Sequence, residues 1–208
     1  LSAIPNILNK KKIGYALSDR QILSLIEDEQ DEKWKYVYQL LATFGLRPAE
    51  LEYLVVKDDG QGEEVWSMYE KSMGGKKGER TEPRELCPLP LIGADGKAVD
   101  FKLLERIKLG EDLPYLGRGG EVAMTMNTRF RRWDLWQRYR KEAERIKQVC
   151  VPYSFRHRYA KASHSKGFPI PNIAESMGHT PEVHMQNYAR FKPSGTKEMY
   201  KNANELAA

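Results

Sequence analysis

Hydrophobic residues recur at helical spacing over most of this chain. Ile22, Leu25 and Ile26 follow the segment Ser18-Asp19-Arg20-Gln21 at the spacing of one helix face. Within that segment Ser18 suits the N-cap, and Gln21 stands three residues later, where it can complete a capping box. Five of the six residues from 27 to 32 are acidic, so this stretch ends the helix or forms a turn.

More helices are expected after this first one. The apolar positions of residues 33–44 predict a helix that Gly45 ends, and Pro48 suits the first turn of a short helix through Leu54. Beyond residue 91 the spacing is again that of helices, over residues 101–108, 125–149, 154–166, 170–177, 181–190 and 196–206.

Between residues 53 and 90 the period changes to that of strands. Three short apolar segments, 54–56, 65–69 and 86–89, are separated by a glycine turn at 58–62 and by a long glycine- and lysine-rich segment, 72–83. These segments fit a small antiparallel sheet. The sequence therefore predicts an α+β fold that is mainly α, with a three-stranded antiparallel β-sheet inserted early.

Length and composition indicate how the chain is organised. Its 208 residues, 40% hydrophobic and 30% charged, suffice for one core. We expect residues 1–17 to be a linker or the cut end of a longer protein, 18–193 to form one domain and 194–208 a C-terminal helical tail. The sequence contains no run of about 18 apolar residues, so it predicts no membrane-spanning helix. The two cysteines suggest neither disulfides nor a zinc site, which favours a cytoplasmic location.

The net charge of +5 is unevenly distributed. Residues 129–147 carry eight Lys or Arg against three acids, which suits a polyanionic partner; the alternative is a solvated helix face. The apolar residues of this predicted helix should face the core, and they are Trp133, Trp136, Ala143 and Ile146. On another face three arginines are seven residues apart and could follow a phosphate backbone: Arg131, Arg138 and Arg145.

Three segments carry residues suited to phosphate chemistry. In Gly45-Leu46-Arg47-Pro48-Ala49-Glu50-Leu51 the arginine lies near a helix start, where anions are favoured, and Glu50 can hold its guanidinium. Tyr153 and Arg156 are three apart, on one face of a helix. Gly178 ends a helix before His179, and Tyr188 follows nine residues later. Taken one by one, these are equally well a surface ion pair, a basic helix start, a structural histidine and a core tyrosine.

Taken together and in order, these segments resemble the tyrosine recombinase (phage integrase) family. That family has Arg in a Gly-Leu-Arg-x-x-Glu-Leu context, a Lys on a strand turn, His-x-x-Arg, then Gly-His and a Tyr nine residues beyond it. Arg47, Arg156, Gly178-His179 and Tyr188 match this pattern, and the order holds from residue 18 to residue 191. Tyr153 departs from it by replacing His; a Tyr-x-x-Arg version resembles the recombinases that excise elements from cyanobacterial genomes.

The resemblance implies the fold of the tyrosine recombinase catalytic domain and a reaction in which Tyr188 forms a covalent 3′-phosphotyrosine with DNA. It further implies that Arg47 and Arg156 bind the scissile phosphate, that His179 donates to it and helps to take the proton from Tyr188, and that Lys71 is the general acid. Lys76 and Lys77, in the following loop, are alternatives to Lys71 or contact DNA. The role of Tyr153 stays open. Neither a metal nor a nucleotide cofactor is implied, because the adduct conserves the bond energy.

The implied partner is double-stranded DNA, bound by four copies of a protein that is a monomer in isolation and is cytoplasmic and nucleoid-associated. The stripe Met199, Ala203 and Leu206 either docks into a neighbouring copy or packs on its own domain. In two alternative interpretations of the function the partner is still DNA: the protein is a type IB topoisomerase-like strand transferase, or it is a non-catalytic DNA-binding relative. A metal-dependent nuclease is disfavoured, since the sequence offers no carboxylate cluster.

Overall fold

The structure, a computed structural model, describes residues 12–58, 60–71, 80–118, 120–191, 195–197, 200–201 and 204. Lys76 and Lys77 lie outside the described residues, as do Met199, Ala203 and Leu206 and most of the helix expected over 196–206.

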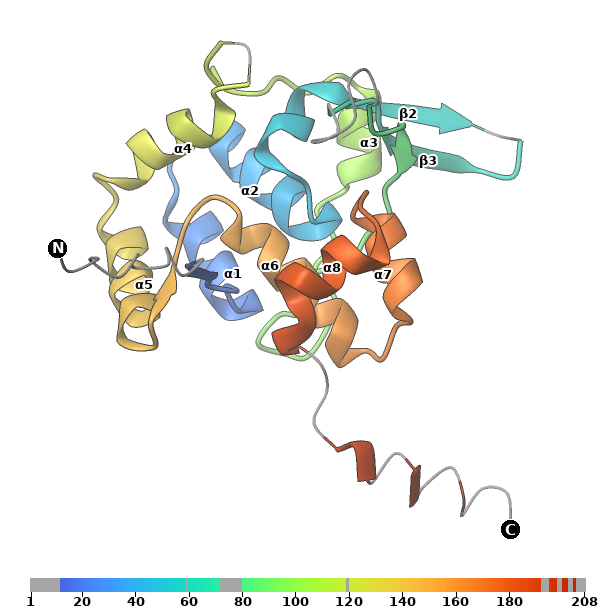
Figure 1. The fold of residues 1–208 in the computed structure, drawn as a ribbon. Coiled ribbons are helices and arrows are strands. Elements are labelled where there is room, and N and C mark those ends of the chain that lie inside the picture. The colour runs from blue at the N-terminus through green and yellow to red at the C-terminus, as the bar shows by residue number, and fades with distance from the viewer. Residues whose placement is uncertain are drawn as a thin grey trace, which may run out of the picture.

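Helices make up most of the described chain, in agreement with the predicted fold class (Figure 1). The α-helices are α1 (Asp19–Asp28), α2 (Glu32–Phe44), α3 (Leu103–Lys108), α4 (Val122–Phe130), α5 (Asp134–Arg145), α6 (Ser154–Ser165), α7 (Ile170–Ser176) and α8 (Pro181–Tyr188). Two 3-10 helices are present, η1 (Pro48–Tyr53) and η2 (Ala189–Phe191). The strands are β1 (Ile13–Gly14), β2 (Leu54–Asp58), β3 (Glu63–Ser67), β4 (Arg84–Glu85) and β5 (Gln148–Val149).

The predicted three-stranded antiparallel sheet is confirmed, in the order β2-β3-β4. Its hairpin of β2 and β3 projects from the helices (Figure 1), and Leu54 pairs with Ser67. The third strand is shorter and earlier than expected, at Arg84–Glu85 instead of 86–89; the next residue, Leu86, is buried in the core and its N–H still donates to Val65 of β3. A second, parallel pair joins β1 to β5, so part of the segment expected to be a linker packs against the domain.

Local signals fix the ends of the first helices. The Ser18–Gln21 capping box is formed at α1. Gly45 ends α2 in the left-handed conformation, with φ 61°, and a Cβ there would lie 2.5 Å from the ring of Tyr159. Glycine is therefore required both for the backbone turn and for the close approach of α6.

The core is centred on α2 and α6, which pack against each other in the middle of the molecule (Figure 1). Tyr38 of α2 stacks on Phe155 of α6 with ring centroids 5.6 Å apart. On its other sides Tyr38 meets Phe130 and Trp133. This aromatic cluster fixes α6, and therefore Arg156, relative to the end of α2.

The prediction of a single helix over 125–149 is wrong, because α4 and α5 are separate helices with a break at 131–133. Phe130 and Trp136 are six residues apart, which would place them about 120° apart around one continuous helix and so on different faces. The break lets both enter the same core, where their rings stack 3.8 Å apart. Trp133, Trp136 and Ala143 pack in or against the core as predicted, whereas Ile146 is 57% exposed, against prediction.

The break also divides the predicted arginine stripe. Arg131 lies between the two helices, and only Arg138 and Arg145 share α5; all three are exposed. Within the described part of the chain every helix is too short or too polar to cross a bilayer.

Candidate active site

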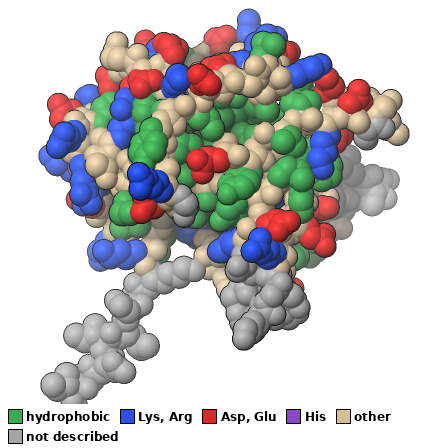
Figure 2. Space-filling model, turned by 90° about the horizontal axis from the view of Figure 1, so that it is seen from above, with side chains coloured by type: hydrophobic (Ala, Val, Ile, Leu, Met, Phe, Trp, Pro, Cys, Tyr) green, Lys and Arg blue, Asp and Glu red, His purple; other side chains and the backbone are tan. Residues whose placement is uncertain are grey.

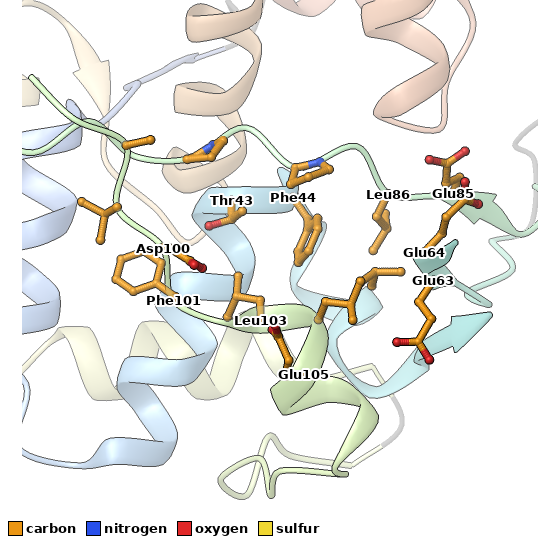
Figure 3. A pocket seen from close by; sticks show the side chains of 16 residues that line it. Thr43, Phe44, Glu63, Glu64, Glu85, Leu86, Asp100, Phe101, Leu103 and Glu105 are labelled. Atoms are coloured by element: carbon orange, nitrogen blue, oxygen red, sulfur yellow. The ribbon is translucent and has the colours of Figure 1, made fainter. Parts of the chain in front are cut away.

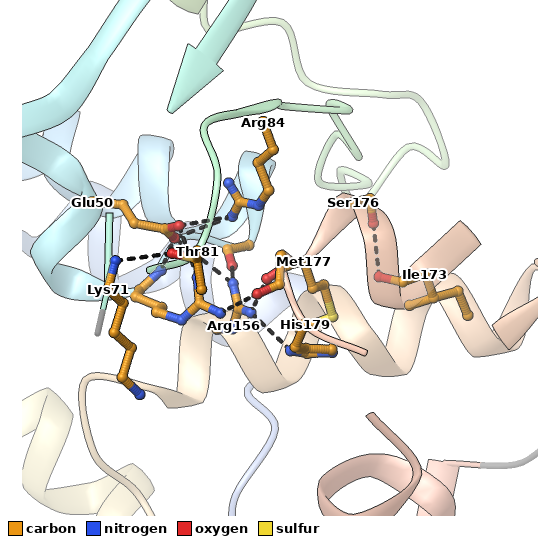
Figure 4. A network of polar contacts seen from close by, with 12 residues as sticks. Glu50, Lys71, Thr81, Arg84, Arg156, Ile173, Ser176, Met177 and His179 are labelled. Carbon is orange, nitrogen blue, oxygen red and sulfur yellow. Dashed lines mark hydrogen bonds and ion pairs between the residues drawn. The ribbon is translucent and has the colours of Figure 1, made fainter. Parts of the chain in front are cut away.

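The buried carboxylate of Glu50, 2% exposed, is the centre of a network that joins distant segments (Figure 4). It accepts hydrogen bonds from the Arg47 backbone N–H at 2.6 Å and from Arg47 Nη1 at 2.9 Å. Arg84 Nη2 donates to it at 3.2 Å, and Arg156 Nη1 lies 3.8 Å away. Arg47 and Glu50 are therefore part of a buried cluster and not a surface ion pair.

The second arginine expected from the sequence, Arg156, comes from the first turn of α6 and is almost fully buried. Its Nη1 donates to the Gly45 carbonyl at 2.6 Å, and its Nη2 donates to the Met177 carbonyl. Arg47 Nη2 donates to the Gly178 carbonyl at 2.6 Å. Both guanidiniums thus hold the corner between α7 and α8 against the end of α2.

Gly178 is required at this corner for two reasons. Its φ is +65°, a conformation that side chains disfavour. A Cβ there would lie 2.6 Å from Arg84 Nε and 3.4 Å from Arg47 Nη1. Glycine therefore lets two guanidiniums approach the backbone directly before His179.

The cluster has an excess of positive charge, because three guanidiniums share one carboxylate. Burial lowers the pKa of Arg84 to about 10, and burial followed by the charge of Arg156 lowers the pKa of Arg47. Both stay protonated at neutral pH. Arg84 Nε and Nη1 are buried with no hydrogen-bond partner. Unpaired donors beside excess positive charge favour an anion at this site.

Histidines continue the network away from the arginines. His179 Nδ1 lies 3.3 Å from Arg156 Nη2, and its Nε2 lies 2.9 Å from His184 Nδ1. Burial, together with the charge of Arg156, lowers the pKa of His179 to about 3, so this imidazole is neutral.

Tyr188, at the end of α8, lies beside these histidines. Its ring centroid is 5.9 Å from that of His179 and 4.9 Å from that of His184. The residue is only 4% exposed and packs with Tyr159 and Met177 in a small second core. The structure thus brings the tyrosine near the arginines and His179, with its side chain buried.

The remaining predicted residues lie around this network. Tyr153, at the start of α6, is 40% exposed, and burial raises the pKa of its hydroxyl although Arg156 and Arg47 oppose the shift. Lys71 is exposed; its backbone N–H donates to Thr81 Oγ1 at 2.9 Å, and its side chain extends away from Glu50 (Figure 4). The α5 arginines are not part of this network.

Sequence reasoning missed three members of the site: Arg84, His164 and His184. A signal existed for two of them. Arg84 is two residues from the buried Leu86, so strand alternation turns it toward the same side. His184 and Tyr188 are four apart, on one face of α8. His164 gave no signal, because its contact with His184 depends on how α6 and α8 pack.

Two hollows differ in the residues that line them. One, of about 950 Å³, lies beside the cluster, and Arg80, Arg84 and His179 line it together with three carboxylates: Glu82, Glu85 and Glu175. Another, of about 360 Å³ (Figure 3), is apolar at its base around Phe44 and Leu103 but has a rim of carboxylates that repels phosphate: Glu63, Glu64, Glu85, Asp100 and Glu105. Figure 2 shows a face whose centre is hydrophobic, with charges of both signs around it. Among the described residues no three His, Cys, Asp or Glu side chains form a group that could hold a metal ion.

Comparison with known proteins adds sequence relatives. The chain is 31% identical over 172 residues to Excisase C of Nostoc sp. (strain PCC 7120), covering 80% of this chain and 31% of that protein. It is 30% identical over 172 residues to Excisase A of the same organism, covering 79% of this chain and 33% of that protein. The chain thus spans about a third of the length of the curated relatives that it matches. No protein-family model matches it.

Solved structures share the fold. The Tn1549 transposon integrase, in complex with circular intermediate DNA, superimposes with a TM-score of 0.55 at 14% identity, over 96% of this chain and 69% of the integrase chain. The same integrase in complex with transposon right end DNA gives a TM-score of 0.53 at 17% identity, over 97% and 69% of the two chains. The chain therefore has the fold of the tyrosine recombinase catalytic domain, and the two excisase relatives and its own ordered motifs support the resemblance to that family.

Proposed function

We propose that this chain cuts and rejoins double-stranded DNA in site-specific recombination, through a covalent 3′-phosphotyrosine at Tyr188. The observation that supports this most is the convergence of Arg47, Arg156 and His179 at one corner, with the Tyr188 ring 5.9 Å from that of His179. These residues come from three separate parts of the chain, since His179 and Tyr188 flank the same helix, α8. Their convergence suits a reaction at a single phosphorus atom.

In the proposed reaction the scissile phosphate binds beside the arginines. The Tyr188 oxygen attacks phosphorus, the bond to the 5′-oxygen breaks, and that oxygen leaves as a hydroxyl after receiving a proton. Guanidiniums can each grip two phosphate oxygens and stabilise the charge that develops in the transition state. Lys71, at the edge of the loop that follows β3, is the proposed proton donor, with Lys76 and Lys77 as alternatives. Reversal of the same steps with another 5′-hydroxyl rejoins DNA without a cofactor.

The burial of Tyr188 adds a step to this proposal. A phenol that is 4% exposed cannot reach a phosphate on the surface of DNA unless its side chain shifts outward. DNA binding would then select the exposed position of the tyrosine.

Covalent capture tests the proposal without knowledge of the target sequence. The chain, with any sequence that flanks it in the gene product, is incubated with a pool of nicked duplexes of random sequence and excess chelator. We expect protein–DNA adducts that survive denaturation and whose DNA converges on a common site. Tyr188→Phe should abolish the adduct, and Tyr153→Phe should show whether that phenol takes part. Strict dependence on magnesium, or an adduct that persists in Tyr188→Phe, contradicts the proposal.

Recombinant products separate this proposal from a topoisomerase-like activity. Two captured sites on one supercoiled plasmid should yield excised or inverted DNA, together with complexes of four copies of the protein on the joined sites. Relaxation without recombinants would instead indicate a strand transferase that acts without partner exchange.

A further inference from the structure

Three of the chain's four histidines form a continuous hydrogen-bonded series, from the arginine cluster into the second core. His179, at the corner before α8, meets His184 of α8 with 2.9 Å between Nε2 and Nδ1. His184 in turn meets His164 of α6, with 2.9 Å between their Nε2 atoms. His164 and His184 are buried. The series is therefore sealed from solvent over most of its length.

Arg156 fixes the direction in which hydrogen bonds are donated along this series of histidines. A guanidinium can only donate, so the 3.3 Å contact makes His179 Nδ1 an acceptor and leaves its proton on Nε2. That proton is donated to His184 Nδ1, which leaves the proton of His184 on Nε2. His164 Nε2 must then accept, so His164 has its proton on Nδ1. One cationic neighbour thereby sets the tautomer of three neutral imidazoles.

From this geometry we propose that the series is a proton relay for Tyr188, with His164 as the final acceptor. The inference rests on the proposed function. As the Tyr188 oxygen bonds to phosphorus, its proton moves to His179 Nδ1. The Nε2 proton of His179 moves to His184 Nδ1, and the Nε2 proton of His184 moves to His164 Nε2. His164 becomes an imidazolium, and the other two rings are neutral again in the opposite tautomer.

Arg156 does not obstruct the first transfer. It is held by the Gly45 and Met177 carbonyls independently of its contact with His179. Loss of the 3.3 Å contact therefore leaves the guanidinium in place while His179 Nδ1 becomes available. The Tyr188 ring already lies along the series, 4.9 Å from His184 and 5.9 Å from His179.

Electrostatics favour the far end of the series as the acceptor. His179 faces Arg156, Arg47 and Arg84 as well as His184, and burial together with the three guanidiniums lowers its pKa to about 3. His184 faces His164 and Arg156, and its pKa is lowered to about 4, burial being again the main cause. The pKa of His164 is lowered by burial alone. A proton on His164 is thus farthest from the guanidiniums, which stay free to stabilise the phosphate.

Imidazole nitrogen NMR on the unmodified protein tests the geometry without DNA. We expect neutral rings protonated at Nε2 in His179 and His184 and at Nδ1 in His164. Any other set of tautomers, or a charged His179 at neutral pH, overturns the relay whether or not the protein cleaves DNA.

The pH profile of cleavage tests the role of His164. His164→Gln keeps an acceptor for His184 but cannot take up a proton. The substrate is a nicked duplex recovered by covalent capture, under single-turnover conditions. We expect cleavage by the variant to be about a hundredfold slower, the lower range for a lost general base. We also expect the fall in rate at acidic pH to move to lower pH, because His184 becomes the last base.

His157→Gln is the matched control, since His157 also lies beside Tyr188, 5.5 Å between rings, but has no contact with the series. It should keep the acidic fall of the wild-type profile. A His164→Gln enzyme with the wild-type rate and profile overturns the proposal. Absence of an adduct from the wild-type protein would instead refute the proposed function, while the tautomers would still decide the geometry.

Discussion

Replacing Gly178 by alanine should damage the site far more than an identical change at another left-handed glycine. Gly167 follows α6 with φ +74°, and a Cβ there meets nothing within 4 Å. Gly178 has φ +65°, and a Cβ there would lie 2.6 Å from Arg84 Nε and 2.9 Å from Arg84 Cδ. The two variants share the cost of the backbone conformation and differ in the clash.

The magnitudes follow from these contacts. A left-handed alanine costs about 1–2 kcal/mol, which is the whole cost expected for Gly167→Ala. In Gly178→Ala the side chain of Arg84 must also move, and its hydrogen bond to the buried Glu50 is weakened or lost. A hydrogen bond to a charged group contributes about 1.5–3 kcal/mol. We therefore expect Gly178→Ala to cost about 2.5–5 kcal/mol, roughly two to three times the control.

Urea unfolding followed by circular dichroism measures the difference in free energy of unfolding, and covalent capture measures its effect on the site. Gly167→Ala should keep the wild-type rate of adduct formation. Gly178→Ala should lose most of it, because displacement of Arg84 disturbs Glu50, which also holds Arg47. Equal stability and equal rates in the two variants would refute the close approach of Arg84 to the corner.

Three other predictions concern charge and packing. Glu50→Gln leaves three guanidiniums without their buried counter-charge and should cost about 3–5 kcal/mol, with sulfate raising its melting temperature more than that of wild type; an equal response to sulfate contradicts this. Burial raises the pKa of Asp19, but hydrogen bonds from Arg158 and from the Ile92 backbone N–H, together with the charge of Arg158, lower it by more, so its net pKa is below 3.8. The stabilisation that ionised Asp19 provides is therefore complete above pH 3.8 and lost as the pH falls through the lowered pKa of Asp19. Asp19→Asn should cost about 2 kcal/mol at pH 7 and almost nothing in strong acid, and pH-dependent unfolding measures this difference. Trp136→Ala should cost about 3–5 kcal/mol by thermal unfolding, whereas Ile146→Lys should change stability by less than about 0.5 kcal/mol; a large cost for Ile146→Lys would argue for the continuous helix.

The sequence by itself determined the features that depend on neighbours a few residues apart. The capping box of Ser18 and Gln21, the glycine end of α2 and the α7–α8 corner at Gly178 follow from backbone requirements that reach over one helical turn. The period of hydrophobic residues sufficed for the mainly helical fold with its three-stranded sheet. The order of Arg47, Arg156, His179 and Tyr188 along the chain indicated the family.

Tertiary structure alone decided which groups meet, because those contacts join residues far apart in sequence. Arg47 and the Gly178 carbonyl are 131 residues apart, and Arg84 reaches Glu50 from a strand whose position was mispredicted. The break between α4 and α5 arises because Phe130 and Trp136 share one core, a demand that no local period encodes. The burial of Tyr188 and the series from His179 to His164 likewise follow from the packing of α8 on α6. Side-chain packing across helices, and not the motif itself, places the phenol of Tyr188 beside His179 and His184.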